Sequence, residues 1–148
     1  EEKLDAADRV AAGRPILEQF GSAVFANKPG DGSAREQAAS CQKVLGGFAN
    51  ICYQFATKRY RSNCINWGIL PFTLDEDTPF DYESGDCVFV PHIRQAVEQG
   101  REDIPAKVIC QDGSVHDLLL HVKGLTADEK EILLRGCLMN YYAARNKE

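Results

Sequence analysis

A short glycine-rich segment contains the residues of this 148-residue chain that could do chemistry. Residues 30–36 read GDGSARE, in which Ser33 and Arg35 are separated by one residue. A glycine-rich loop that leads into a helix presents free backbone N–H groups and a partial positive charge to an anion. Arg35 could grip a carboxylate with two N–H groups, and Ser33, with its oxygen stabilised as an anion, could act as a general base. The segment therefore predicts a carboxylate- or phosphate-binding loop with a proton acceptor beside it.

The same spacing also fits a purely structural role. Ser33 and Glu36 form the S-x-x-E pattern of a capping box, in which the serine hydroxyl accepts a hydrogen bond from a backbone N–H group of the helix. Arg35 could then pair with Glu36 or with Asp31 on the helix surface. On these residues alone, the capping role is favoured over the catalytic one.

Two other kinds of active site fit the sequence poorly. The serine-hydrolase pattern G-x-S-x-G needs glycines two residues before and after the serine, where Asp31 and Arg35 stand. His116 and His121 are an odd number of residues apart on one predicted strand, so their side chains should point to opposite faces. A structural role is favoured for both, and for His92.

Composition and charge describe one ordinary globular domain. The chain is 44% hydrophobic and 26% charged, which suits a single core and neither a membrane-spanning nor a disordered protein. A net charge of -5 argues against a general nucleic-acid-binding surface, which needs clustered Lys and Arg. The one basic cluster, Lys58, Arg59 and Arg61, is interpreted as a solvated helix face. The N-terminal sequence lacks the charged and apolar regions of a signal peptide.

The cysteines predict neither a metal site nor a cluster site within this chain. The six are Cys41, Cys52, Cys64, Cys87, Cys110 and Cys137. They show no C-x-x-C pair and no short His/Cys spacing. Several lie in apolar runs, where a reduced thiol behaves as a small hydrophobic side chain. We therefore expect a reducing, intracellular setting, and specifically the cytoplasm.

The elements that must position the glycine-rich loop are a strand before it and a helix after it. Residues 22–27 predict a buried strand, and residues 33–45 predict a helix that ends at two glycines. The apolar stripe of that helix would consist of Ala34, Ala38, Cys41 and Leu45. Residues 47–56 predict a second strand and residues 57–66 a polar helix. Gly68 and Pro71 then bracket a sharp change of direction.

The second half of the chain predicts a hairpin followed by a long helix. Residues 75–84 form an acidic loop, residues 86–90 a strand and residues 92–100 a short helix. The hairpin joins residues 106–110 to residues 115–122 through the turn at Asp112 and Gly113. The final helix runs from Thr126 to about Ala144, with Thr126 and Glu129 as a capping box. Its inward-facing residues would be Ile132, Leu133, Leu138 and Tyr142.

Several of these segments, in this order, resemble the swivelling C-terminal domain of the aconitase superfamily. That family carries G-x-G-S-S-R-E-H-A at its substrate loop, and residues 30–38 read GDGSAREQA. The segments QKVLGG, GFANICYQFA, SNCINWGILPF and LLRGCLMNYYAARNKE extend the resemblance over nearly everything from Ser22 onward. The resemblance implies an α/β fold, the β/β/α three-layer swivelling domain, over residues 22–148. Residues 1–21 would be an N-terminal helical segment at an excised boundary.

The resemblance also implies a function. Ser33, as an alkoxide, would remove a proton from the substrate carbon, Arg35 would bind a substrate carboxylate, and Gly32 and Ala34 would line the same loop. The reaction would be the reversible dehydration of a hydroxy-polycarboxylic acid. A four-iron, four-sulfur cluster would be bound by another domain of the same polypeptide or by a large subunit, so the isolated chain is expected to be inactive. Neither a membrane nor a nucleic acid is an expected partner.

Two positions depart from the family pattern. Ala34 replaces the second serine, and Gln37 replaces the histidine of R-E-H. The pattern looks most like a divergent bacterial aconitase-like hydratase, and the departures leave its substrate open. The family's opening strand with its D-x-I-x-T-D-like motif does not appear before Ser22, so we expect Glu1 to be a boundary within a longer polypeptide.

Two alternative readings stay open. The chain could be an independent small subunit, as in isopropylmalate isomerase, which the lack of that opening strand disfavours. It could also be a non-catalytic interaction or regulatory module derived from an aconitase domain, including one that binds RNA. The acidic charge balance and the presence of Ser33 and Arg35 weigh against this second alternative.

Overall fold

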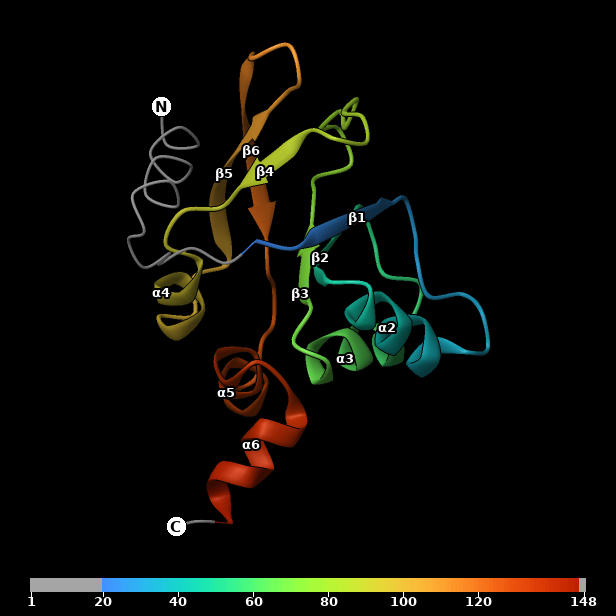
Figure 1. Cartoon of the computed structure of the whole chain (residues 1–148), viewed down its shortest axis with the longest axis vertical. Coiled ribbons are helices and arrows are strands. Elements are labelled where there is room, and N and C mark those ends of the chain that lie inside the picture. Colours follow the sequence, from blue (N-terminus) through green and yellow to red (C-terminus); the bar gives the residue numbers. More distant parts are fainter. Residues whose placement is uncertain (1–19, 147–148) are drawn as a thin grey trace.

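The computed structural model of this chain describes residues 20–146, so the predicted helical segment at the N-terminus lies almost wholly outside the described residues. Strands and helices alternate in the first half of the chain, and a hairpin and two helices make up the end (Figure 1). The strands are β1 (Ser22–Ala26), β2 (Gly47–Cys52), β3 (Leu70–Thr73), β4 (Cys87–Phe89), β5 (Asp103–Ile109) and β6 (Val115–His121). The helices are α2 (Arg35–Val44), α3 (Lys58–Asn66), α4 (Ile93–Glu98), α5 (Ala127–Arg135) and α6 (Leu138–Arg145).

The first half of the sheet is parallel and is built from two consecutive βαβ units. β1 pairs with β2 and β2 with β3, with α2 and α3 as the crossover helices. Both crossovers step in the same direction across the sheet, and such connections are right-handed, so both helices must cover the same face. Figure 1 shows α2 and α3 side by side on that face, and their packing agrees with this. The strand, loop and helix predicted around the glycine-rich segment are thus all present.

The second half of the sheet is antiparallel and completes the order β1-β2-β3-β6-β5-β4. The β5–β6 hairpin turns at Asp112 and Gly113, as predicted, and β4 pairs along the outer side of β5. β3 and β6 are joined by a single residue pair, Thr73 with His121. The α/β fold class is therefore confirmed, as one curled six-stranded sheet with helices packed on it.

His121 holds the junction between the two halves of the sheet. Its ring is almost fully buried, with Nδ1 2.8 Å from a carboxylate oxygen of Asp103 and Nε2 3.1 Å from one of Asp75. The hydroxyl of Thr73 donates to the His121 carbonyl oxygen at 3.4 Å. These contacts connect β5, β6 and the end of β3, whereas His116 is exposed on the same strand.

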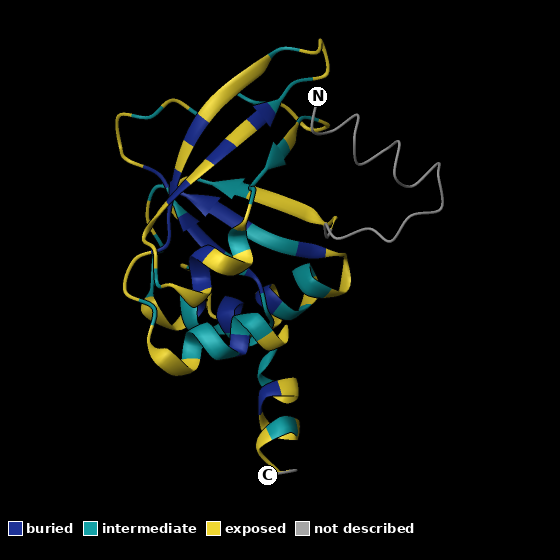
Figure 2. Ribbon diagram, turned by 90° about the vertical axis from the view of Figure 1, so that its left-hand side faces the viewer, coloured by how far each residue is buried: buried dark blue, intermediate teal, exposed yellow. Residues whose placement is uncertain are grey.

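Three groups of buried side chains form the core. The largest lies on the sheet and includes Ile51, Phe72, Ile104, Val108 and Leu120. A second group, Ala39, Tyr60, Cys64 and Ile69, joins α2 and α3 to the sheet. A third, Ile65, Ile132 and Tyr141, joins α3 to α5 and α6. The last helix projects from the body of the domain (Figure 2).

Two burial predictions at the start of the chain are wrong. β1 is an edge strand paired only with β2, and its first residues, including Val24, are exposed. The predicted apolar stripe of α2, which ran through Ala38, Cys41 and Leu45, faces solvent. The side of α2 that meets the sheet instead has the fully buried Ala39 and the half-buried, polar Gln42, which hydrogen-bonds to β2.

Two further predictions, one at β3 and one at the last helix, are only partly right. The change of direction predicted at Gly68 is present, since α3 ends at Asn66 and β3 begins at Leu70, but Pro71 itself lies inside β3, where it pairs with Asn50 of β2. The single long helix predicted after Thr126 is divided at Gly136, whose φ of 93° ends α5. Because the break changes the helical phase, Tyr141 is buried in place of Tyr142, which is 55% exposed.

Candidate functional site

The glycine-rich loop connects β1 to α2 at the edge of the molecule (Figure 1). It follows the carboxyl end of a parallel strand, which is the edge at which α/β sheets characteristically bind ligands. The segment after β2, residues 53–57, leaves the sheet at this same edge because β1 and β2 are parallel. The loop and this segment are therefore neighbours although they are far apart in the sequence.

Backbone hydrogen bonds tie the first part of the loop to that segment. The carbonyl oxygen of Asn27 accepts from the amides of Tyr53 and Gln54 at 3.2 and 3.3 Å. The carbonyl oxygen of Pro29 accepts from the Ala56 amide at 2.9 Å. The chain is thus held in place up to the residue that precedes Gly30.

At Gly30 the loop turns away from residues 53–57. Its φ of 96° is in the left-handed region, and a Cβ added to it would lie 2.5 Å from Cβ and Cγ of Tyr60. Its carbonyl oxygen accepts two hydrogen bonds, one from the Thr57 hydroxyl at 3.4 Å and one from Nε of Arg35 at 3.3 Å. A glycine is required here both for the backbone conformation and for the close approach of Tyr60.

Ser33 does not cap the following helix, so the predicted capping box is wrong. α2 begins at Arg35, its N-cap is Ala34, and no side chain caps it. Ser33 therefore lies one residue too early to act as the cap, and Glu36 lies one residue too early to complete the box. The Glu36 carboxylate instead accepts a hydrogen bond from Nε1 of Trp67 at 3.1 Å, which ties α2 to the end of α3.

Ser33 and Arg35 both have polar side-chain groups that are not paired with other groups of residues 20–146. Ser33 is exposed, and its hydroxyl makes no hydrogen bond to residues 20–146. Arg35 is half-buried and uses Nε on Gly30, while its terminal nitrogens pair with no carboxylate of residues 20–146. The alternative pairing of Arg35 with Asp31 or Glu36 is thus not formed. The two side chains flank a helix N-terminus whose first N–H groups lack a side-chain partner.

The other two predicted loop residues, Gly32 and Ala34, are both small and exposed. Gly32 is exposed, and a Cβ added to it would meet no atom within 4 Å. Ala34 is also exposed and offers no hydroxyl. The structure therefore places Gly32, Ser33, Ala34 and Arg35 together on one open surface loop.

A buried polar network, which the sequence did not predict, contacts the loop through Tyr60, whose ring packs against Gly30. Asn50 is 2% exposed, accepts from Nε2 of Gln42, and donates to the hydroxyl of Tyr60 at 3.2 Å. Its amide nitrogen also lies 3.2 Å from Sγ of Cys64. Burial raises the pKa of Tyr60 to about 12, so its phenol stays protonated near neutral pH. The available signal was an asparagine within an otherwise apolar strand.

The basic cluster predicted on α3 divides into two kinds of residue. Lys58 and Arg59 are exposed, as expected for a solvated helix face. Arg61 is half-buried, donates to the carbonyl oxygen of Lys123 at 2.6 Å and lies 3.6 Å from Glu129. It therefore connects α3 to the start of α5 and belongs to the scaffold.

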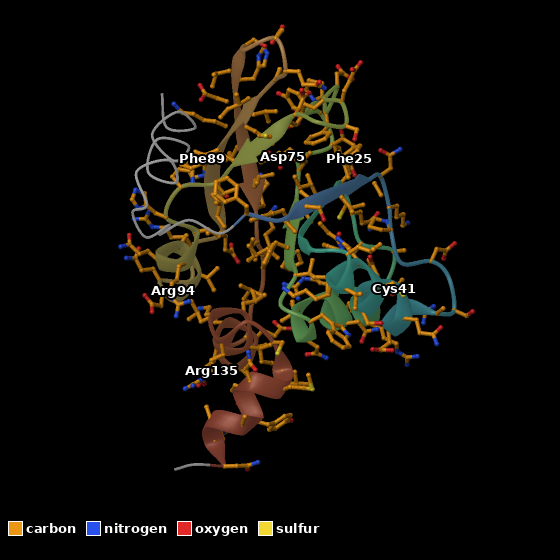
Figure 3. All side chains as sticks on the ribbon, viewed as in Figure 1. Phe25, Cys41, Asp75, Phe89, Arg94 and Arg135 are labelled. Carbon is orange, nitrogen blue, oxygen red and sulfur yellow. The ribbon has the colours of Figure 1, made fainter. Side chains whose placement is uncertain are left out.

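The described residues do not fit an iron-sulfur cluster. Within residues 20–146 no three His, Cys, Asp or Glu side chains are grouped so that they could hold a metal ion. A four-iron cluster needs several cysteine thiolates close together, whereas Cys41 and Cys87 are exposed and Cys52 and Cys64 are buried in the core. Figure 3 shows Cys41 on α2, across the molecule from Arg94 on α4 and Arg135 on α5.

One further absence concerns membranes. Across the part of the chain that the structure describes, every helix is too short or too polar to cross a bilayer.

The fold and the loop together define an α/β domain of the kind found in aconitase-type hydro-lyases. Residues 14–77 match the family model described as the aconitase C-terminal domain. The chain is 31% identical over 127 residues to aconitate hydratase A of Bradyrhizobium diazoefficiens, which covers 84% of this chain and 14% of the relative. It is 36% identical over 112 residues to the 3-isopropylmalate dehydratase small subunit of Metallosphaera sedula, covering 76% of this chain and 58% of the relative.

A solved structure gives the same result. The 3-isopropylmalate dehydratase structure from Methanocaldococcus jannaschii superposes with a TM-score of 0.54 at 27% sequence identity, covering 88% of this chain and 68% of that one. The chain therefore belongs to the aconitase superfamily and corresponds to its C-terminal swivelling domain. It spans less than two thirds of the length of either sequence relative. Enzymes of the aconitase family carry a four-iron, four-sulfur cluster.

Proposed function

We propose that this chain is the substrate-binding swivelling domain of an iron-sulfur hydro-lyase that acts on a hydroxy-polycarboxylic acid. Ser33 accepts the proton from the substrate carbon, and Arg35 binds a substrate carboxylate. The observation that carries the proposal is that both side chains keep their reactive groups free beside an uncapped helix N-terminus. The family membership supports the reaction type, and the free side chains on the loop support the choice of residues.

Each role follows from the position of the residue. The partial positive charge at the start of α2 favours a negative charge on the neighbouring Ser33 oxygen, which is the form in which that oxygen accepts a proton. Arg35 anchors Nε on Gly30 and offers its terminal N–H groups, which suit the two oxygens of a carboxylate. The open space at Gly32 lets the substrate approach the loop backbone. Holding the carboxylate in this way would bring the C–H bond to Ser33.

The proposal also implies a partner. The loop is exposed, and the residues that the structure describes fit no cluster, so we expect a cluster-bearing body to close over the loop. That body is either another domain of the same polypeptide or a separate large subunit. The small-subunit relatives support the second arrangement and the aconitate hydratase supports the first. The isolated chain is expected to be inactive, and its residues contribute only carboxylate binding and proton transfer.

The test is turnover by the assembled enzyme, reconstituted anaerobically with its cluster, on a panel of hydroxy-polycarboxylic acids. Loss of a general base costs about 10²- to 10⁴-fold, so Ser33→Ala should lower kcat by at least about 100-fold. Arg35→Gln should mainly raise KM. Ser40→Ala, which removes a hydroxyl from the same helix where it bonds only to Gln37, is the matched control and should change neither constant.

Two results would count against the proposal in different ways. Turnover that survives Ser33→Ala would remove Ser33 from the role of base. If no acid is turned over although the cluster is intact, the non-catalytic interaction module becomes the better explanation, and the replacements at Ala34 and Gln37 would be its mark in the sequence.

A further inference from the structure

The hydroxyl of Thr57 connects the start of α3 to the glycine-rich loop. As the N-cap of α3, it accepts a hydrogen bond from the Tyr60 amide at 3.2 Å. The same oxygen donates to the carbonyl oxygen of Gly30 at 3.4 Å. One hydroxyl thus serves two elements that are 27 residues apart in the sequence, and the accepted bond constrains the direction in which its proton points.

The Gly30 carbonyl oxygen is in turn the acceptor for Nε of Arg35. Thr57 and Arg35 therefore approach the same atom, one from the N-cap of α3 and one from the start of α2. On the remaining side, Tyr60 packs against Gly30, with Cγ only 2.5 Å from where a Cβ would be. The position of this carbonyl is determined by groups that belong to α3, and the direction of the Arg35 guanidinium depends on it.

Helix capping alone does not account for this geometry. Thr126 caps α5 with the same contact, accepting from the Glu129 amide at 3.2 Å, and it sits in a complete capping box. No described loop carbonyl receives a hydrogen bond from the Thr126 hydroxyl. The additional hydrogen bond of Thr57 goes to Gly30, the residue on which Arg35 is anchored. Arg35 is the side chain proposed to bind a substrate carboxylate.

We infer that Thr57 is a positioning residue for the anion-binding loop. By holding the Gly30 carbonyl, it fixes Nε of Arg35 and leaves the terminal guanidinium nitrogens oriented before any ligand arrives. Such preorganisation increases affinity because less side-chain freedom is lost on binding. The residue deepens the function proposed above, and its effect on substrate rests on that function, but its effect on Arg35 does not.

The first experiment measures Arg35 directly in the 148-residue chain. The Nε–H group of Arg35 is followed by ¹⁵N NMR relaxation in wild type, Thr57→Val, Thr57→Ser and Thr126→Val. Thr57→Val is expected to lower the order parameter of this group toward that of an exposed, unanchored arginine. Thr57→Ser keeps the hydroxyl and should preserve the order. Thr126→Val loses an equivalent helix cap and should leave Arg35 unchanged, so that a general loss of stability cannot imitate the effect.

The second experiment uses the assembled enzyme and its hydroxy-acid substrate. Thr57→Val is expected to raise KM about fivefold, the equivalent of one neutral hydrogen bond, with a smaller change in kcat. Thr57→Ser should restore KM to within about twofold of wild type. This experiment separates the two proposals, since Ser33→Ala tests Ser33 as the base and Thr57→Val tests the positioning of Arg35.

The outcomes are distinct. Equal Arg35 order in Thr57→Val and Thr126→Val overturns the inference even if the enzyme is an active hydro-lyase. Selective loss of Arg35 order in Thr57→Val supports it even if no hydroxy acid is turned over. Loss of order without any change in KM would show that the coupling exists but does not act on substrate, which overturns the functional part.

Discussion

Gly68 and Gly136 lie backbone to backbone: a Cβ added to Gly68 would be 2.6 Å from the carbonyl carbon of Gly136 and would overlap its oxygen. Gly68 follows α3 and leads into β3, whereas Gly136 separates α5 from α6. Both have positive φ, 70° and 93°. The contact therefore brings the last two helices against the element that supports the candidate loop.

Gly68→Ala is predicted to destabilise the domain strongly. The added methyl group meets backbone, which cannot rotate away, and the positive φ adds about 1 kcal/mol, so a total loss of about 3 kcal/mol or more is expected. Gly124→Ala is the matched control, because Gly124 also has positive φ (65°) but open space around it, and about 1 kcal/mol should be lost there. Urea unfolding of both variants makes the comparison. Equal losses would show that the Gly68–Gly136 contact adds nothing.

The two glycines of the loop are predicted to respond differently. Gly30→Ala clashes with Tyr60 at 2.5 Å and strains a φ of 96°, so it should lower stability by about 2 kcal/mol or more and displace the Arg35 anchor. Gly32→Ala meets no atom within 4 Å and should leave the unfolding transition unchanged. If the substrate approaches Gly32 as proposed, this variant should nevertheless raise KM. A Gly32→Ala enzyme with unchanged KM would place the substrate elsewhere.

Stability is predicted to fall in alkali because of two buried groups. Burial raises the pKa of the Cys52 thiol from 9.0 to about 12 and that of the Tyr60 phenol from 10.0 to about 12. Both groups are neutral when protonated, and the unfolded chain loses these protons first. Their contribution to the free energy of unfolding is therefore complete below pH 9 and is lost as the pH rises toward 12. For each group, the free energy of unfolding falls by at most about 1.4 kcal/mol per pH unit.

Denaturant unfolding across this pH range checks the prediction. Tyr60→Phe keeps the ring against Gly30 but removes the hydroxyl group. This variant should be less stable than wild type below pH 9 and should lose less stability as the pH rises. Tyr142→Phe, at a tyrosine that is 55% exposed, should follow the wild-type pH dependence. The idea fails if Tyr60→Phe and Tyr142→Phe show the same slope.

The sequence predicted the elements of the fold well because local signals determine them. The strand, glycine loop and helix around Ser33, the hairpin turn at Gly113 and the capping box at Thr126 all rest on short-range patterns, and the structure has them. The inward and outward faces were predicted less well. The apolar stripe through Ala38 and Cys41 faces solvent because tertiary contacts, among them the polar contact of Gln42 with Asn50, determine which side of α2 meets the sheet.

The candidate site shows the same division. Its residues were proposed from the GDGSARE motif, but their local contacts were not predicted, since Ser33 does not cap α2 and Glu36 reaches Trp67 at the end of α3. Thr57 could not be connected to the loop from the sequence, because the contact depends on β1 and β2 being parallel neighbours. Contacts between residues distant in sequence require the topology, which single-sequence periodicity does not contain.

The junction at His121 gives the last prediction. β3 and β6 share one residue pair, and the contacts of His121 with Asp75 and Asp103 reinforce the junction beside the apolar core that spans both halves of the sheet. His121→Ala should destabilise the domain by about 2 to 4 kcal/mol, because a buried side chain is lost and two carboxylates lose their shared partner. His116→Ala, at an exposed position on the same strand, should change stability by less than about 0.5 kcal/mol.

Native-state hydrogen exchange can show whether His121 acts as a junction or only as a core residue. If it joins the halves, His121→Ala should accelerate exchange of β5 and β6 amides more than those of β1 and β2, because the hairpin would open without the parallel half. Uniform acceleration across all strands would show that the sheet opens as one unit and that the single β3–β6 pair is not its weak point. The comparison is internal to one variant, so a difference in overall stability between proteins cannot produce it.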